Sequence, residues 1–300
     1  MKQVTNPNGK NTETNKELYA PNAAVKNIIG KKTKKIMNVN NADIAKVFSN
    51  TVMHGSQLPY RYWFIATHLL TSTKKIVSAS ELQRQLGHST YHPIWALIHK
   101  LRMAMGRRDS KYSLEEVMEL DEGFFTTETD ENEKDNPLKR GRGSQRKTKV
   151  LVMVESKPVE GEMTKKGKPR KVGHMKMFII EDLKAETINS KVSVNIGKNS
   201  IIDSDHSTSY TNFHTLVKEH RPKVIPKNEV GKMLLWVHMA ISNAKRMLLE
   251  IFHDIQSEYL QSYLKEFCYK FNRIYFGEKR FDRLMIATVN YKNQFRYNIK

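Results

Sequence analysis

The hydrophobic pattern changes its period near residue 114, and this change divides the chain into two kinds of structure. Before it, in residues 41–108, apolar side chains recur three or four residues apart, which is the spacing of one helical face. After it come short apolar runs of the kind that form strands. The sequence therefore predicts an all-α part followed by a part built on a β-sheet.

The order of elements after residue 114 restricts the sheet to few topologies. EVMELDEGFF predicts a strand ending at Asp121, VLVMVES (150–156) a second strand, and KMFIIED (176–182) a third. A helix over KAETINSKV, a strand at 199–206, a helix over Thr211–His220 and a short strand at PKVIP follow. Two long helices, 233–252 and 257–271, complete the series. This order predicts an α/β, ribonuclease H-like domain: a mixed five-stranded sheet with flanking helices, whose first three strands are antiparallel.

The all-α part contains a helix-turn-helix pattern. Ser78 and Glu81 have the spacing of a capping box, and Gly87 can end that helix in a left-handed conformation. A second helix over 91–105 carries an apolar stripe and, on its other side, basic residues. Helix, glycine-containing turn and basic helix predict a DNA-reading module, in which the second helix enters a major groove. The alternative is a plain helical bundle with a solvated basic face.

The charge of the chain points to a polyanionic partner. Lys and Arg number 51 against 31 Asp and Glu, a formal net charge of +20. Such an excess favours nucleic acid or an anionic membrane surface. No run approaches the roughly 18 apolar residues of a membrane span, and the polar N-terminus lacks a secretory signal. We therefore expect a cytoplasmic, nucleoid-associated protein without a membrane partner, the alternative being a ribosome-associated or merely basic one.

Several basic residues are candidates for contacting DNA. Two stretches, 139–149 and 164–171, are strongly basic, and the sequence that continues from the helix over 91–105 ends in Arg107 and Arg108. The predicted DNA-binding residues are His99, Lys100, Arg102, Arg107, Arg108, Lys139, Arg140, Arg142, Arg146 and Lys147.

These patterns divide the chain into four regions. We expect a disordered basic arm at 1–40, the helical DNA-binding module at 41–110, the ribonuclease H-like domain at 111–276 and a basic tail at 277–300. The one cysteine, Cys268, lies in an apolar helical stretch and is expected to be a core residue. No disulfide and no cysteine-based zinc site is expected.

Two aspartates are the candidates for chemistry. Asp121 ends the first strand of the sheet, and Asp205 lies near the end of the fourth, two residues after Asp203. Carboxylates at strand ends suit Mg²⁺, which needs only one or two protein oxygens besides water and phosphate. Adjacent strands can bring the two together at a metal site for phosphoryl transfer. The alternative is that both cap turns or helices, as lone aspartates usually do.

Several segments, in order and spread from about Ser56 to Ala287, resemble bacterial insertion-sequence transposases of the ISXO type, members of the DDE superfamily. The similar segments are LPYRYWFIATHLLTSTKKIVSASELQRQLG, MELDEGFF, KRGRGSQRKTKVLVMVES, DSDHSTSY, WVHMAISNAKRML, LQSYLKEFCYKFNR and FDRLM. Because they are collinear over most of the chain, they are more specific than any single motif.

The resemblance implies a catalytic site. It makes Asp121 and Asp205 catalytic ligands of Mg²⁺ or Mn²⁺ and places the third position at Asn243, where the superfamily usually has glutamate. Lys245 would meet a phosphate, and Glu250 or His238 are alternative ligands. The implied activity is cleavage and strand transfer at the ends of an insertion sequence. The implied partners are double-stranded DNA, both element ends and target, and further copies of the chain in a dimer or larger assembly.

Two other interpretations stay open. Related transposases often begin with a cysteine zinc ribbon, whereas residues 1–40 contain no cysteine. Together with Asn243, this favours a catalytically decayed transposase that acts only as a DNA-binding protein. A basic RNA-binding protein of ribosomal type is the third interpretation, and it predicts that Asp121 and Asp205 lie apart.

Overall fold

The computed structural model describes residues 50–129, 135, 137, 139–141, 144–158, 170–224 and 234–291. The predicted arm at 1–40, the first residues of the predicted helical module (41–49) and most of the basic stretch 164–171 lie outside the described residues. No helix within the described ranges combines the length and the apolarity that a membrane crossing requires.

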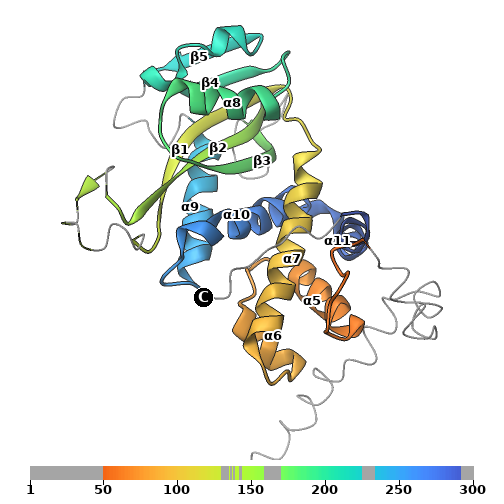
Figure 1. Ribbon diagram of the computed structural model, residues 1–300. Coiled ribbons are helices and arrows are strands. Elements are labelled where there is room, and N and C mark those ends of the chain that lie inside the picture. Colours follow the sequence, from red (N-terminus) through yellow and green to blue (C-terminus); the bar gives the residue numbers. More distant parts are fainter. Residues whose placement is uncertain are drawn as a thin grey trace, which may run out of the picture.

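The sheet has five strands and mixed direction (Figure 1). They are β1 (Val117–Thr126), β2 (Lys147–Pro158), β3 (Arg170–Ile180), β4 (Ile201–Asp205) and β5 (Glu219–Lys223). Their order is β3-β2-β1-β4-β5. β1 pairs antiparallel with β2 and β2 with β3, whereas β4 is parallel to both β1 and β5. The predicted ribonuclease H-like fold is therefore confirmed.

Helices cover the two faces of the sheet. Strand side chains alternate between these faces, so Met118 and Leu120 of β1 meet α8 (Ala185–Asn195) in one core. On the opposite face α9 (Leu235–Leu249) and α10 (Ser257–Asn272) pack on Phe125, Val152 and Met177. Strands β1 to β3 are thus covered on both faces of the sheet. Because Met118 and Leu120 point toward α8, the odd-numbered side chains of β1 point toward α9.

Two expectations about this domain are wrong in detail. β1 does not end at Asp121, because its pairing with β2 continues to Thr126, although its pairing with β4 stops at Leu120. Residues 211–220 do not form a helix: two 3-10 turns, Thr208–Tyr210 and Phe213–Thr215, lead into β5. Serine, threonine and asparagine in this segment favour local turns over helix, and pairing of β5 with β4 supplies the backbone partners.

The N-terminal helices match the sequence pattern closely. They are α5 (Tyr60–Ser72), α6 (Ala79–Leu86) and α7 (Tyr91–Ser110). The Ser78 hydroxyl accepts a hydrogen bond from the Glu81 amide at 3.1 Å. Gly87 ends α6 with φ +62°, a conformation that costs glycine little. The cap and the stop of this helix are therefore confirmed.

The last helix returns to this N-terminal module. Residues 279–290, expected to belong to a tail, form α11 (Lys279–Asn290). Its Leu284 and Ala287 are buried in the same core as Trp63 of α5, and the Val52 amide donates to the Thr288 carbonyl at 3.2 Å. The helical module is thus built from both ends of the described chain (Figure 1).

A buried ion pair joins the helical module to the sheet domain. Arg102 of α7 donates from Nε to Glu266 of α10 at 2.8 Å, and both side chains are almost wholly excluded from solvent. Lys270 Nζ lies 2.7 Å from the same carboxylate and also donates to the Lys75 carbonyl at 2.6 Å. Burial alone would raise the pKa of Glu266, but Lys270 and Arg102 hold it below its usual value.

Candidate catalytic site and nucleic-acid surface

Asp121 and Asp205 come together because β1 and β4 are parallel and in register. The last paired residues are Leu120 and Ser204, and each aspartate follows directly. Neighbouring strands lie about 4.8 Å apart, so the two side chains leave the sheet next to each other on the α9 face. Both line one open cavity of about 580 Å³. The structure thus brings together the two aspartates that the sequence singled out.

Two further acids on this face have structural partners. Glu119 is buried, and its Oε2 accepts hydrogen bonds from the Trp236 and Val237 amides at 2.6 and 3.0 Å. It therefore caps the positive end of α9. Asp203, also buried, lies 3.1 Å from Lys223 Nζ. Asp121 and Asp205 are more exposed than these two acids and are the pair that lines the cavity.

His238, in the first turns of α9, also lines this cavity, as do Glu122 and His206. Its Nδ1 lies 3.4 Å from Asp121 Oδ2. Its Nε2 is buried and has no hydrogen-bond partner among the described residues. Burial lowers the pKa of His238, while the charges of Glu119 and Asp205 act in the opposite direction.

Asn243 and Glu250 do not line the cavity. Asn243 is exposed, and at about 100° per residue it lies roughly 140° around α9 from His238. Glu250, at the end of α9, pairs with Lys75 Nζ at 3.0 Å. The Lys245 side chain is partly buried. Burial and the charge of Lys147 lower its pKa, whereas the charge of Asp121 acts to raise it. Of the predicted site residues, Asp121 and Asp205 therefore line the cavity, whereas Asn243 and Glu250 lie outside it.

Glu122, next to Asp121, points to the other side of the strand but also lines the cavity. Its carboxylate accepts a hydrogen bond from the Tyr210 hydroxyl, and burial followed by the Glu122 charge raises the pKa of that phenol. Across the ranges that the structure describes, no three Asp, Glu, His or Cys side chains converge closely enough to hold a metal ion. An ion at Asp121 and Asp205 would accordingly take further ligands from water or phosphate.

The prediction that the basic side of α7 faces solvent is wrong for two residues, His99 and Arg102. Arg102 is buried in the ion pair with Glu266, and His99 is buried with Nδ1 3.1 Å from the Ser262 hydroxyl. Burial, with a smaller effect of Arg102, lowers the pKa of His99 to about 3. The reason is that α10 packs along this side of α7, so neither side chain is available to DNA.

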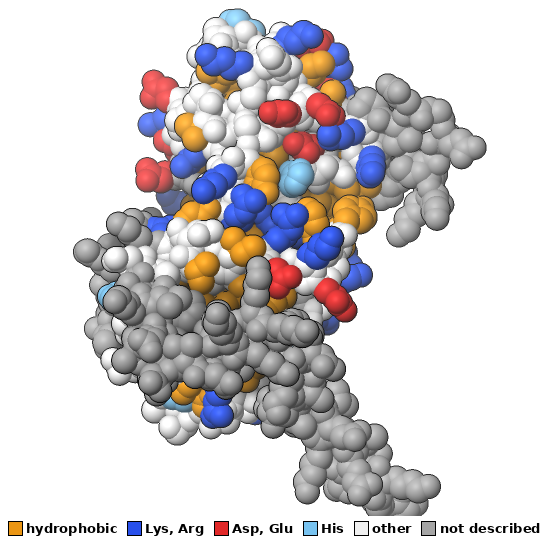
Figure 2. All heavy atoms as spheres, turned by 90° about the vertical axis from the view of Figure 1, so that its right-hand side faces the viewer, with side chains coloured by type: hydrophobic (Ala, Val, Ile, Leu, Met, Phe, Trp, Pro, Cys, Tyr) orange, Lys and Arg blue, Asp and Glu red, His pale blue; other side chains and the backbone are white. Residues whose placement is uncertain are grey.

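The other predicted DNA contacts lie nearer the surface. Lys100 is half-buried, with Nζ 6.0 Å from the ring centre of Trp63, and burial lowers its pKa. Arg107 and Arg108 are half-buried near the end of α7. Four residues are exposed before or at the start of β2, namely Lys139, Arg140, Arg146 and Lys147, whereas Arg142 lies outside the described residues. Figure 2 shows Lys and Arg side chains gathered at the waist between sheet and helical module.

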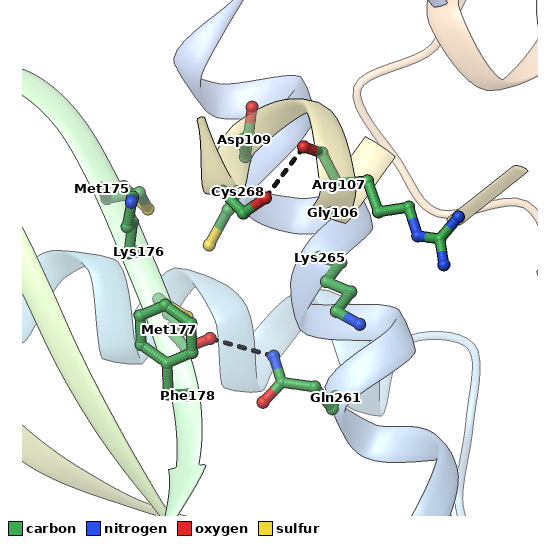
Figure 3. A pocket seen from close by; sticks show the side chains of 11 residues that line it. Gly106, Arg107, Asp109, Met175, Lys176, Met177, Phe178, Gln261, Lys265 and Cys268 are labelled. Atoms are coloured by element: carbon green, nitrogen blue, oxygen red, sulfur yellow. Dashed lines mark hydrogen bonds between the residues drawn. The ribbon is translucent and has the colours of Figure 1, made fainter. Parts of the chain in front are cut away.

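A second cavity lies where α7, β3 and α10 meet (Figure 3). It measures about 180 Å³, and its lining includes Gly106, Met177, Lys265 and Cys268. Lys265 and Arg107 extend away from Cys268, whose thiol pKa is raised by burial. Cys268 is a buried core residue, as predicted, and is not an activated nucleophile. This cavity belongs to the joint between the helical module and the sheet.

Comparison with known proteins gives one family match. The model of the ISXO2-like transposase domain matches residues 113–272. Two solved structures are similar to this chain, each at 13% sequence identity. One is a pre-cleavage Mos1 transpososome, for which the TM-score is 0.29 and the alignment covers 82% of this chain and 82% of that chain. The other is a Mos1 transposase paired-end complex with left transposon end, for which the TM-score is 0.26 and the alignment covers 80% of this chain and 82% of that chain. No curated protein matches the chain.

Proposed function

Because this chain belongs to the family of ISXO2-like transposase domains, we propose that it cleaves DNA at the ends of an insertion sequence and joins the freed 3′ ends to target DNA. One observation carries the proposal. Asp121 and Asp205 stand side by side at the ends of the paired part of β1 and β4, and both face one open cavity. The matched residues include both aspartates.

The two carboxylates fit a divalent metal ion. Oxygen ligands in register on two adjacent inner strands, at an open cavity, suit Mg²⁺ or Mn²⁺, which keep positions for water and substrate phosphate. Asp121 and Asp205 would hold the ion. When bound, it supplies positive charge that stabilises the attacking and leaving oxygens of an in-line displacement. No zinc site enters the proposal.

The other candidate site residues have different proposed roles. Lys245 lies within electrostatic range of Asp121 and would contact a phosphate near the site. The family resemblance supports Asn243 in a metal-binding role, although its side chain is exposed. The Lys75 contact of Glu250 favours a structural role for that carboxylate.

Double-stranded DNA, as element ends and as target, is the proposed partner. Exposed Lys139, Arg140, Arg146 and Lys147 would bind backbone phosphates, and Arg142 belongs to the same basic stretch. Arg107 and Arg108 extend this set on α7. Because two element ends must be held together before joining, a dimer or larger assembly on DNA at the nucleoid is the proposed working form.

An end-cleavage assay with Mg²⁺ or Mn²⁺ tests the proposal. Asp121→Asn and Asp205→Asn should each reduce cleavage more than about 100-fold, since metal charge stabilisation is worth several kcal/mol. DNA binding should persist in both variants. Asp282→Asn, an exposed acid on α11, is the matched control and should keep full activity.

Full cleavage by Asp121→Asn would refute the assignment of the site. Salt-dependent DNA binding by the unaltered chain without any cleavage would support the alternative, a decayed transposase that only binds DNA. The absence of a three-ligand cluster among the described residues is the observation that favours this alternative.

A further inference from the structure

Lys265 of α10 lies across α7 at Gly106. A Cβ added to Gly106 would come within 3.0 Å of three methylene carbons of Lys265, closer than real side chains pack. The absence of a side chain at position 106 therefore lets the lysine stem rest directly on the backbone of α7. Arg107 is the next residue of that helix. This close contact between two helices brings the ammonium group of Lys265 near Arg107.

The two cations share one side of the joint between α7, β3 and α10. Figure 3 shows the side chains of Lys265 and Arg107 extending to the same side, away from Cys268. Burial lowers the pKa of Lys265, and the charge of Arg107 lowers it further. The joint is at the waist of the molecule, the level at which Figure 2 shows Lys and Arg side chains gathered. Two like charges are thus held close together, each partly buried.

The acids nearest in the sequence do not neutralise these two cations. Asp109, the one acid of α7, lies 2.5 Å from Arg273 at the end of α10. Glu266, which follows Lys265, is already bound to two other cations. In the part of the chain that the structure describes, no acidic side chain offsets the effect of burial on Lys265. Holding an ammonium group partly buried beside another cation is unfavourable, so this geometry favours a bound anion.

We propose that Lys265 and Arg107 together bind one backbone phosphate of DNA; this rests on the proposed function. A phosphate offers several acceptor oxygens, so an ammonium and a guanidinium group from two helices can bind it at once. The net charge of +20 and the basic waist favour DNA as the source of the phosphate. The joint shares no lining residue with the cavity of Asp121 and Asp205. The contact therefore holds DNA at a second place, and it adds α10 to the elements that bind DNA.

Salt-dependent binding of DNA to the full chain tests this proposal without any cleavage. The anisotropy of a short fluorescent duplex gives the affinity from about 50 to 200 mM salt, and the logarithmic slope reports the number of phosphate contacts. Lys265→Gln removes the charge and should weaken binding about tenfold and reduce the slope by about one. Lys265→Arg keeps the charge and should retain most of both. Thermal unfolding checks that each variant folds.

Gly106→Ala separates the position of the lysine from its charge. The new Cβ displaces the stem of Lys265 while both cations remain, and alanine is favourable inside a helix. We expect binding to weaken by at least about threefold, since the phosphate loses a placed partner. Lys184→Gln is the matched control, because Lys184 is exposed and already lies 3.6 Å from Asp182. Its affinity and slope should equal those of the unaltered chain.

An affinity and slope that stay unchanged in Lys265→Gln would overturn the site. Unchanged binding in Gly106→Ala would show that the contact between the helices does not place the lysine. Inorganic phosphate at constant ionic strength is the second probe. If it stabilises the chain against heat only when Lys265 is present, while the DNA slope is unaffected, the site binds free phosphate and the assignment to DNA is wrong. Failure of the proposed DNA partner is a separate result, since the unaltered chain would then show no salt-dependent binding.

Discussion

The buried pair Arg102–Glu266 gives the sharpest stability prediction. Replacing Arg102 by methionine keeps the length and apolar stem of the side chain but removes the charge and the hydrogen bonds to Glu266 and to the Val77 carbonyl. Removing one partner of a buried pair typically costs about 3–5 kcal/mol, because the other charge stays buried. Here Lys270 still faces Glu266 at 2.7 Å, so we expect the lower end, about 3 kcal/mol.

The exposed pair Arg84–Glu81 is the matched control for this measurement. Its N···O distance, 2.7 Å, is as short as that of the buried pair, but its side chains are 63% and 39% exposed. Solvent screens such a pair, so Arg84→Met should change the free energy of unfolding by less than about 1 kcal/mol. Urea unfolding followed by fluorescence of the tryptophans, among them buried Trp63, gives both values.

A double-mutant cycle with Glu266→Gln separates the pair from other effects of the substitution. The two changes should be strongly non-additive, because each removes the same interaction. The reasoning is refuted if Arg102→Met costs no more than Arg84→Met, or if the effects of Arg102→Met and Glu266→Gln simply add. Either result would mean that the joint between α7 and α10 is held by apolar packing alone.

Three further predictions follow from local geometry. Gly87→Ala should lower the free energy of unfolding by about 1 kcal/mol, measured as a lower thermal midpoint. The reason is the backbone angle φ of +62°, which strains a residue with a Cβ, and not a clash, since no atom lies within 4 Å of where that Cβ would be. An unchanged midpoint would refute this. Glu119→Gln should cost about 2 kcal/mol in urea unfolding, since the buried cap of α9 loses its charge; a loss below about 0.5 kcal/mol would contradict the capping role. Because the pKa of Glu266 lies below its ordinary 4.5, its contribution is present above that pH and is lost as pH falls through the lower, folded value. Stability measured between pH 6 and roughly 3 should therefore fall less steeply in Glu266→Gln, and equal slopes would count against the ion pair.

The sequence predicted the features that depend on near neighbours. The Ser78 cap and the stop at Gly87 follow from residues a few positions apart, and the meander of β1 to β3 follows from the order of consecutive elements. The structure has all of them. The pairing of Asp121 with Asp205 needed one long-range assumption, that their strands are parallel neighbours, and β1 and β4 meet it.

Features that depend on distant partners could not be predicted in this way. The basic side of α7 looked solvated because its cover, α10, lies more than 160 residues further along the chain. In the same way, the resemblance implied Asn243 as the third site residue, but only the packing of α9 on β1 shows that His238 is the side chain beside Asp121. The helix expected at 211–220 gave way to a strand because β4 offers its backbone partners there.

The return of α11 to the N-terminal helices has a consequence for the order in which the protein is made. The core around Trp63 needs Leu284 and Ala287, so α5 to α7 leave the ribosome long before the helix that completes their packing. At about 5–20 residues per second, the stretch between the end of α7 and the start of α11 takes roughly 10–30 s to synthesise. During that interval the sheet and its helices emerge and can fold, while the earlier helices still expose the surface that α11 will cover. The first helices of the described chain are therefore among the last parts to reach their final packing, and translation that stops before residue 279 leaves them without it.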